Sequence, residues 1–274
     1  MIPYLLRGGE AVLDGVAEQV ACIQCIAITG THSAGKSTLM NDFMQALDPL
    51  EGQLYPWLRE ATFTLASGIT IPIVGVTEAA TDYAHTIAKD PSVMTHNYRM
   101  EHQIGVESIA FNRLLYGGQR CAELAASYQS SNRRLIGLLI SDRTPLDGHV
   151  YSRLRLPAEE QVYIDMEHVA QFTGGRPPKT VHDSPIPYRW RIRRSVREMV
   201  DIALLPDHTE VAFEHTDVRI EGEAFRDTVA NAINAYYSRL LTADQVQVVH
   251  GSREERLTAV ATHALQLISQ HIAA

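Results

Sequence analysis

A glycine-rich segment at residues 26–40 contains the clearest chemical pattern of the chain. Within it, Gly30, Gly35, Lys36 and Ser37 fit the phosphate-binding pattern G-x-x-x-x-G-K-[ST]. In this pattern backbone N–H groups surround a phosphate chain at the positive end of the next helix, the lysine reaches the β- and γ-phosphates, and the serine holds Mg²⁺. The pattern predicts ATP and Mg²⁺ as ligands, bound by the whole phosphate loop: Gly30, Thr31, His32, Ser33, Ala34, Gly35, Lys36, Ser37 and Thr38.

The flanks of the phosphate loop agree with this interpretation. Residues 25–29 form a short apolar run, which is typical of a buried strand. From Lys36 onward, Leu39, Met40 and Phe43 share one face of a predicted helix. Strand, glycine loop and helix is the context that the pattern requires. The alternative is a chance match within a globular protein, and both flanks argue against it.

Asp142 and Arg143 form a second candidate group, just after the apolar run 135–140. An aspartate at the end of such a strand fits the second nucleotide-binding motif, whose carboxylate binds Mg²⁺ directly or through water. The alternative is an aspartate that caps the next helix. ATPases that hydrolyse with water commonly carry a glutamate where Arg143 stands. Because an arginine instead suits the charge of a transferred phosphoryl group, the pair favours a kinase.

The elements that position these residues alternate along the chain. Strands are predicted at residues 25–29, 69–76, 135–140, 210–215 and 246–249. Helices are predicted at residues 9–20, 36–46, 56–67, 78–90, 96–116, 119–130, 157–172, 193–205, 224–241 and 254–272, with a turn at Gly117-Gly118 and an irregular segment at 174–190. This alternation predicts a parallel sheet covered by helices on both faces.

The expected fold class is α/β: a P-loop NTPase three-layer α/β/α sandwich with a mainly parallel sheet. We expect a single kinase-like domain over residues 1–274, with an insertion that forms a lid or cover at 157–208. Ligands of such sheets bind at the carboxyl ends of the strands. Residues that follow predicted strands should therefore share one edge with the phosphate loop, namely Glu78, Asp142-Arg143, Asp217-Arg219 and Gly251-Ser252.

Residues 142–147, Asp-Arg-Thr-Pro-Leu-Asp, and then Tyr151 also carry a family resemblance. They resemble the Asp-Arg-Ser/Gly-x-x-Asp-x-x-x-Tyr signature of P-loop kinases for nucleosides and related small molecules. Within that group the chain is most similar to AAA-type ATPase/kinase domains, akin to the ribosylnicotinamide kinase domain of NadR. Three weaker stretches agree with the family's pattern: residues 77–80, residues 217–219 with Phe225-Arg226, and residues 249–257.

The resemblance implies roles for residues on both sides of the site. Glu78 lies where relatives place an acid beside the acceptor hydroxyl, as general base or orienting group. Lys36, Arg143 and the lid arginines Arg219 and Arg226 would neutralise charge on the γ-phosphoryl group. The family pattern also implies acceptor contacts from Arg143, Arg226, Arg99 and Gln103, and passage of the nucleotide base along Gly251 and Ser252. Thr81-Asp82 stand where relatives often carry an arginine.

Some of these candidates have structural interpretations as well. Glu78 could be an acid that stabilises the start of a helix through the helix dipole. His32 is expected to be an ordinary loop side chain, since that position of the pattern accepts many residues. An arginine run is either a second source of phosphate-binding cations or a solvated helix face: Arg189, Arg191, Arg193, Arg194 and Arg197.

Composition limits the class of protein. The chain has 274 residues, of which 45% are hydrophobic, and a formal net charge of −8. The apolar content can fill a core, and the charge argues against broad non-specific binding of nucleic acid. No apolar run approaches the ~18 residues of a membrane span, and no signal-peptide pattern is present, so we expect a cytoplasmic protein. Cys22, Cys25 and Cys121 are expected to be core residues, because a zinc site needs a second ligand pair.

The leading hypothesis is an ATP-dependent kinase that transfers the γ-phosphoryl group to a hydroxyl of a nucleoside, nucleotide or related small molecule. One alternative is a regulatory P-loop ATPase or GTPase that acts through a partner; the GTP version is weakened because no N-K-x-D motif is present. Another is a kinase that acts on a modified base in DNA or RNA, which the arginine run permits and the net charge of −8 disfavours. No pattern identifies the acceptor or the oligomeric state.

Overall fold

The computed structural model describes residues 10–12, 20–52, 54–80, 96–129, 135–156, 188–212 and 222–272. Its strands are β1 (Glu10–Val12), β2 (Val20–Ile28), β3 (Asp48–Pro49), β4 (Leu58–Thr64), β5 (Thr70–Val76), β6 (Leu135–Asp142), β7 (Ile202–Pro206) and β8 (Val246–Val249). Its helices are α1 (Lys36–Gln45), α3 (His96–Tyr128), α4 (Pro145–Arg155), α6 (Tyr188–Met199), α7 (Glu223–Leu240) and α8 (Arg253–Ile272), with a 3₁₀ helix, η3, at His208–Glu210.

The described strands form one eight-stranded sheet in the order β3-β4-β5-β6-β2-β7-β8, with β1 paired to the start of β2. Strands β5, β6, β2, β7 and β8 are parallel neighbours, whereas β1, β3 and β4 pair antiparallel. All residues of β6 are buried, as expected for a strand with both faces covered. The carboxyl ends of five parallel strands therefore meet at one edge of the sheet.

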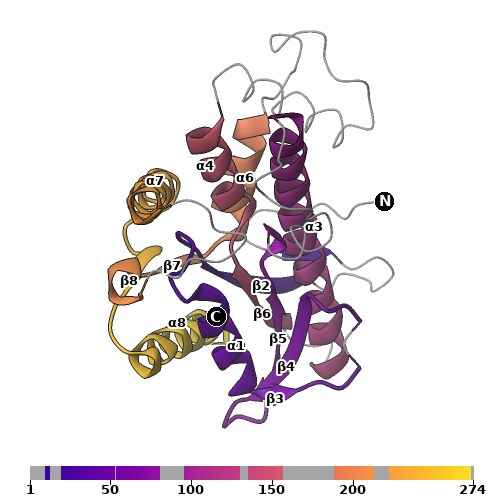
Figure 1. The fold of residues 1–274 in the computed structure, drawn as a ribbon. Helices are drawn as coiled ribbons and strands as arrows, with labels where there is room; N and C mark the ends of the chain where they lie inside the picture. Colours follow the sequence, from indigo (N-terminus) through magenta and orange to yellow (C-terminus); the bar gives the residue numbers. More distant parts are fainter. Residues whose placement is uncertain are drawn as a thin grey trace, which may run out of the picture.

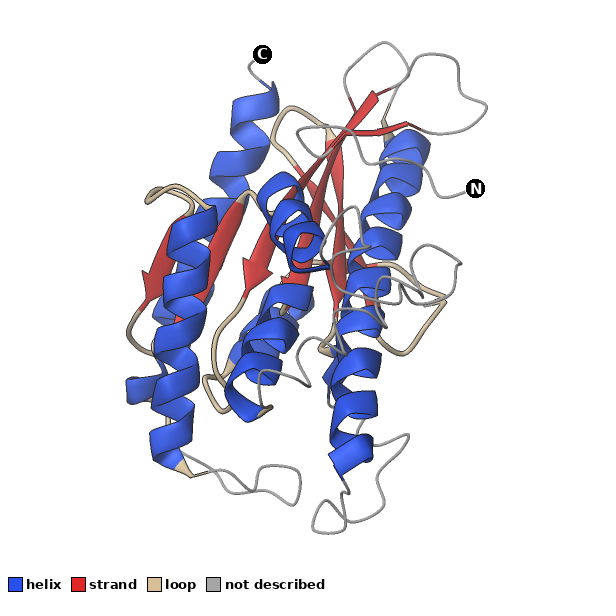
Figure 2. Ribbon diagram, turned by 90° about the horizontal axis from the view of Figure 1, so that it is seen from above, coloured by secondary structure: helices blue, strands red, loops and turns tan. Residues whose placement is uncertain are grey.

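Helices cover the sheet on both faces, and β2 shows how the two cores are divided. Ile23, Cys25 and Ala27 of β2 pack in one core with α3, α4, α6 and α7. Ile26 and Ile28, which point to the other face, pack in a second core with α1 and α8. Figures 1 and 2 show these layers. The expected three-layer α/β/α sandwich with a mainly parallel sheet is confirmed.

Six of the predicted elements are present close to their predicted bounds. The predictions at 36–46, 69–76, 135–140, 224–241, 246–249 and 254–272 correspond to α1, β5, β6, α7, β8 and α8. The predicted helix at 157–172 and the irregular residues 174–187 lie outside the described residues, as does most of the predicted helix at 78–90. No helix in the described ranges is long and apolar enough to cross a membrane.

The predicted turn at Gly117-Gly118 is wrong, because α3 runs through both glycines as one helix of 33 residues. Gly117 has a packing role instead. A Cβ atom at this position would approach Val76 Cγ1 to 2.7 Å and Leu139 Cδ1 to 2.9 Å. The missing side chain therefore lets the middle of α3 lie close to β5 and β6, which both end at the candidate site.

Replacing Gly117 by alanine is expected to lower the free energy of unfolding by about 1–3 kcal/mol, because the new methyl group meets side chains of the sheet. Gly118 supplies a matched control, since a Cβ atom there has no neighbour within 4 Å. G118A should raise the free energy of unfolding by ~0.5–1 kcal/mol, because alanine has less backbone entropy than glycine in the unfolded chain and so loses less on folding. Urea unfolding measures both variants. Equal stabilisation of the two would contradict the packing role of Gly117.

One predicted helix near the N-terminus is a strand, and the described residues of another also lie in strands. Residues 56–67 contain β4, which forms a hairpin with β5 around a turn where Gly68 has φ +81°. Residues 10–12 of the predicted helix 9–20 form β1, and β2 begins at Val20 rather than at 25. In both places pairing with a neighbouring strand overrides a local preference that one sequence segment cannot reveal.

The predicted helix at 193–205 and the predicted strand at 210–215 are also corrected. Helix α6 ends at Met199, and residues 202–206 form β7, which lies between β2 and β8. Residues 208–210 form η3, and 213–215 lie outside the described residues. A short apolar run suits a buried strand as well as a helix, so periodicity alone could not separate them. The 157–208 segment therefore ends in a strand of the central sheet.

Candidate functional site

The phosphate loop joins β2 to α1 with a backbone that suits its glycines. Gly30 and Gly35 have φ values of +130° and +77°, in the region that side chains disfavour. Gly35 also occupies the position before the first helical residue, Lys36, and no side chain caps the first turn of α1. The N–H groups of this turn have no partner within the helix, so they are suited to phosphate oxygens.

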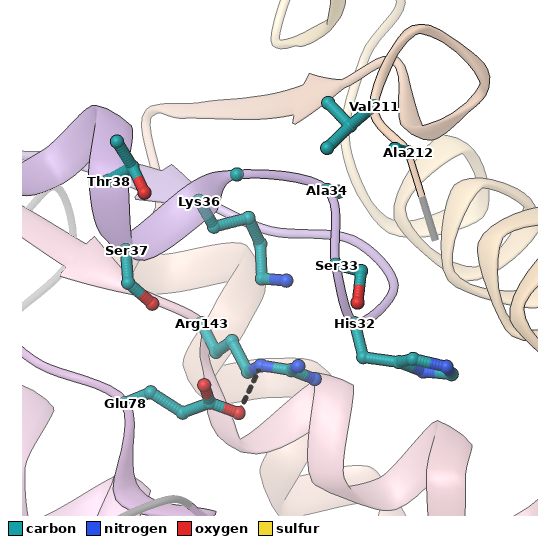
Figure 3. A pocket seen from close by; sticks show the side chains of 11 residues that line it. His32, Ser33, Ala34, Lys36, Ser37, Thr38, Glu78, Arg143, Val211 and Ala212 are labelled. Carbon is teal, nitrogen blue, oxygen red and sulfur yellow. Dashed lines mark ion pairs between the residues drawn. The ribbon is translucent and has the colours of Figure 1, made fainter. Parts of the chain in front are cut away.

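A pocket with a cavity volume of about 230 Å³ lies over this loop (Figure 3). One wall is the loop itself, and the opposite wall carries Glu78 and Arg143. The described residues that line the pocket are His32, Ser33, Ala34, Gly35, Lys36, Ser37, Thr38, Glu78, Arg143, Val211 and Ala212. The fold therefore brings together the phosphate loop, the segment after β5 and the segment after β6, as the sequence predicted.

Lys36 is a buried cation in the pocket wall that the phosphate loop forms. Its ammonium donates a hydrogen bond to the Thr31 carbonyl, which holds the side chain along the loop. Burial, and then the Arg143 guanidinium, lower the pKa of Lys36 to about 8. The carboxylates that oppose this shift are Glu78, Asp142 and Asp147. A phosphate anion in the pocket would favour the charged form of Lys36.

Asp142 ends β6 beside the pocket and is 3% exposed. Neither of its carboxylate oxygens has a hydrogen-bond partner. Burial, and then the Glu78 carboxylate, raise the pKa of Asp142 to about 6, while Lys36, Ser37 and Arg143 oppose that shift. Buried carboxylates in proteins are normally hydrogen-bonded or paired with a cation. A buried carboxylate whose oxygens lack a close hydrogen-bond partner, next to Ser37 in the first turn of α1, therefore fits a hard cation such as Mg²⁺.

Arg143 and Glu78 form an ion pair inside the pocket, with 2.7 Å between Arg143 Nε and Glu78 Oε1 (Figure 3). Burial alone would lower the pKa of Arg143, but Glu78 and then the Tyr151 side chain raise it, so the guanidinium stays charged. The Arg143 guanidinium lies over the Tyr151 ring at 5.2 Å. Arg143 also has φ +74°, a strained value for a residue with a side chain.

Helix α4 holds the phosphate loop through two side chains that the sequence identified only by resemblance. Asp147 Oδ1 accepts hydrogen bonds from the Thr29 hydroxyl at 2.5 Å and from the Gly30 backbone N–H at 3.2 Å. The Tyr151 hydroxyl accepts a hydrogen bond from the His32 backbone N–H at 2.9 Å. These two residues of the 142–151 segment therefore fix the start of the loop rather than contact the pocket.

Tyr237 supports the same network and was missed by the sequence analysis. Its hydroxyl donates to Asp147 Oδ2 at 3.0 Å and lies 2.6 Å from the Thr144 hydroxyl. Thr144 and Asp147 also form a capping box at the start of α4. Tyr237 lies on α7, far from the loop in sequence, so no local pattern could have indicated it.

Comparison with known proteins gives structural likeness only. No protein-family model and no curated protein matches the sequence. The chain is similar to the NadR protein in complex with NAD and AMP-PNP, with 14% identity, a TM-score of 0.49, and coverage of 92% of this chain and 50% of NadR. It is also similar to deoxyadenosine kinase from M. mycoides, with 12% identity, a TM-score of 0.47, and coverage of 89% and 100%. The chain spans about half the length of the NadR chain.

The geometry of the phosphate loop and of the sheet establishes the fold without the comparisons. A central parallel strand runs into a glycine loop with left-handed residues, the loop runs into a helix without a side-chain cap, and the neighbouring parallel strand ends in Asp142. The chain has a P-loop fold, a three-layer α/β/α sandwich. In this P-loop fold, Gly251 and Ser252 follow β8 at the same edge as the phosphate loop and are not among the described residues that line the pocket.

The remaining predicted site residues are only partly described. Arg226 is buried and donates from Nη1 to the Val211 carbonyl at 3.0 Å, so it holds the pocket rim rather than lining the pocket. Arg219 and the side chains of Arg99 and Gln103 lie outside the described residues. In the arginine run, Arg194 pairs with Glu198 at 2.7 Å, and Arg193 lies over the Tyr236 ring. Arg197 is exposed. The side chains of Arg189 and Arg191 lie outside the described part of the chain.

Proposed function

We propose that this protein is an ATP-dependent kinase that transfers the γ-phosphoryl group to a hydroxyl of a nucleoside, nucleotide or related small molecule. The main observation behind the proposal is that two groups of residues face each other across one pocket. The phosphate loop with Lys36 forms one wall, and the Arg143–Glu78 ion pair forms the other. Arg143 stands where ATPases that hydrolyse with water commonly carry a glutamate, and its guanidinium suits the charge of a transferred phosphoryl group. The Glu78 carboxylate beside it suits an acceptor hydroxyl.

The residues of the pocket divide the reaction between them. Loop N–H groups and Lys36 bind the β- and γ-phosphates. Ser37 and Asp142 would hold Mg²⁺, which supplies charge neutralisation on the phosphates when bound. A bond forms between the acceptor oxygen and the γ-phosphorus, and the bond from that phosphorus to the oxygen of the β-phosphate breaks, so that ADP leaves. Glu78 orients the acceptor hydroxyl and takes its proton, and Arg143 offsets charge on the transferred group.

The proposal is tested by a transfer screen with labelled ATP over nucleosides, nucleotides, other small hydroxyl compounds and oligonucleotides. We expect ATP turnover to rise sharply with one class of small acceptor. Turnover that is indifferent to every acceptor would instead support a regulatory ATPase. Transfer to an oligonucleotide, with binding that falls steeply as salt rises, would support a polymer acceptor.

Glu78→Gln is expected to lower phosphoryl transfer by about 10²–10⁴-fold, because the amide cannot accept the hydroxyl proton. ATP affinity, measured by calorimetry, should stay unchanged. Glu223→Gln is a matched control, since Glu223 pairs with Arg226 at 3.1 Å but is absent from the lining of the pocket. If Glu78→Gln removed ATP binding together with transfer, Glu78 would belong to the nucleotide side rather than to the acceptor side.

A further inference from the structure

The peptide between Ala34 and Gly35 decides whether one N–H group of the phosphate loop faces the pocket. In a planar trans peptide the Ala34 carbonyl and the Gly35 N–H point in opposite directions. Both residues line the pocket. A carbonyl held away from the pocket therefore directs the Gly35 N–H toward it. Because glycine accepts either sign of φ, this peptide can flip unless something holds it.

Arg256 is the side chain that holds this carbonyl. It lies in the first turn of α8, is 6% exposed, and donates from Nη1 to the Ala34 carbonyl at 3.4 Å. The same guanidinium donates from Nε to the Gly251 carbonyl at 2.9 Å. From Nη2 it donates to the Asp207 carbonyl at 3.0 Å and to Glu210 Oε2 at 2.8 Å. One buried cation thus joins the phosphate loop to the turns after β7 and β8.

Glu210 keeps the guanidinium in place. Its Oε2 accepts from Arg256 and also from the Gly251 backbone N–H at 2.6 Å. Charge-assisted hydrogen bonds of this kind are stronger than neutral ones, and a buried guanidinium without a carboxylate would be costly. Glu210 lies one residue before Val211, whose carbonyl is bound by Arg226 and which lines the pocket. The rim of the pocket and the phosphate loop are therefore fixed by one network.

We propose that Arg256 is a positioning residue for nucleotide binding. It holds the Ala34 carbonyl away from the pocket, so that the Gly35 N–H is directed at phosphate before the ligand arrives. This inference rests on the proposed nucleotide site. A lysine keeps the positive charge but lacks the planar fork that reaches several carbonyls at once. Arg256→Lys therefore separates the geometry of the side chain from its charge.

The test compares Arg256→Lys with Arg253→Lys as a matched control. Arg253 also starts α8 and pairs with a carboxylate, that of Asp42 on α1, but its side chain is 72% exposed. Among the described residues its hydrogen bonds go to Asp42 and not to the phosphate loop. Binding of Mg-ATP and of inorganic tripolyphosphate is measured by calorimetry, and the melting temperature is measured without ligand. We expect Arg256→Lys to weaken both ligands about tenfold, as for the loss of one hydrogen bond to a charged group. Arg253→Lys should bind both like the wild type.

The outcomes separate this inference from the proposed function. Wild-type affinity of Arg256→Lys for both ligands would overturn the positioning role. Weaker binding of ATP together with unchanged binding of tripolyphosphate would also overturn the positioning role. The effect would then come from the turn after β8 and not from the phosphate loop. A wild-type protein that binds neither ligand would refute the proposed nucleotide site itself. If Arg256→Lys does not fold, Glu210→Gln replaces it, with weaker tripolyphosphate binding by the folded protein expected and unchanged binding contradicting the role.

Discussion

Replacing Lys36 by alanine is expected to lower phosphoryl transfer by about 10³-fold or more while the protein stays folded. Lys36 is the cation of the phosphate loop and lies in the pocket wall that faces Arg143 and Glu78. In the proposed mechanism, its removal takes away a positive charge that would neutralise the γ-phosphoryl group in the transition state. The measurement is the rate of transfer from labelled ATP, with the acceptor found by the screen and in its absence.

The stability of Lys36 variants distinguishes a specific loss of phosphoryl transfer from a general loss of folding. Burial lowers the pKa of Lys36 to about 8, so the buried charge is not a source of stability in the ligand-free protein. Lys36→Met, which keeps the apolar stem, should therefore unfold at a urea concentration no lower than that of the wild type. Transfer activity retained in either variant would remove the phosphate loop from the mechanism. A large loss of stability in both would assign Lys36 a structural role.

The sequence predicted which segments meet at the pocket better than it predicted the elements around them. Gly30, Gly35, Lys36 and Asp142 could be placed at a loop and at a strand end from the local chain, because both features are encoded within a few residues. Their placement at one sheet edge follows from a rule of parallel sheets, and that rule is obeyed here. The position of Glu78 opposite the loop was predicted for the same reason.

What the sequence could not show depends on contacts between distant segments. The run at 202–206 is a strand only because β2 and β8 pair with it. Gly117 is a contact point on the sheet only because Val76 and Leu139 lie against α3. Tyr237 and Arg256 support the phosphate loop from α7 and α8, each about 200 residues away in the chain. Local periodicity carries no information on such pairs.

Replacing Asp142 by asparagine is expected to stabilise the ligand-free protein and, at the same time, to abolish Mg²⁺-dependent transfer. The Asp142 carboxylate is buried without a hydrogen-bond partner, and its pKa is raised to about 6. Below pH 3.8 the carboxyl is protonated in both the folded and the unfolded protein, and stability is not reduced. As the pH rises from 3.8 through about 6, the unfolded protein loses this proton more readily than the folded one, and stability falls. At pH 7 the loss is on the order of 2–3 kcal/mol, and the uncharged amide avoids it.

Asp201 supplies the matched control for this experiment. Burial also raises the pKa of Asp201 to about 6, but its carboxylate accepts the Cys25 backbone N–H at 2.7 Å and it is absent from the lining of the pocket. Asp201→Asn should remove the fall in stability between pH 3.8 and about 6 that the raised pKa of Asp201 causes, and should keep phosphoryl transfer. Urea unfolding between pH 4 and 8, with and without Mg²⁺, measures both variants.

Magnesium binding gives the decisive contrast between the two aspartates. A cation that binds only the folded protein adds to its stability. Wild type and Asp201→Asn should therefore gain stability when Mg²⁺ is added, and Asp142→Asn should not. Mg²⁺-dependent transfer by Asp142→Asn would show that this carboxylate is not the metal ligand. A lower stability of that variant at pH 7 would show that the carboxylate has a partner that stabilises the fold. The expected pair of results, more stability with no transfer, would mean that the buried charge is kept for Mg²⁺ at a cost to the fold.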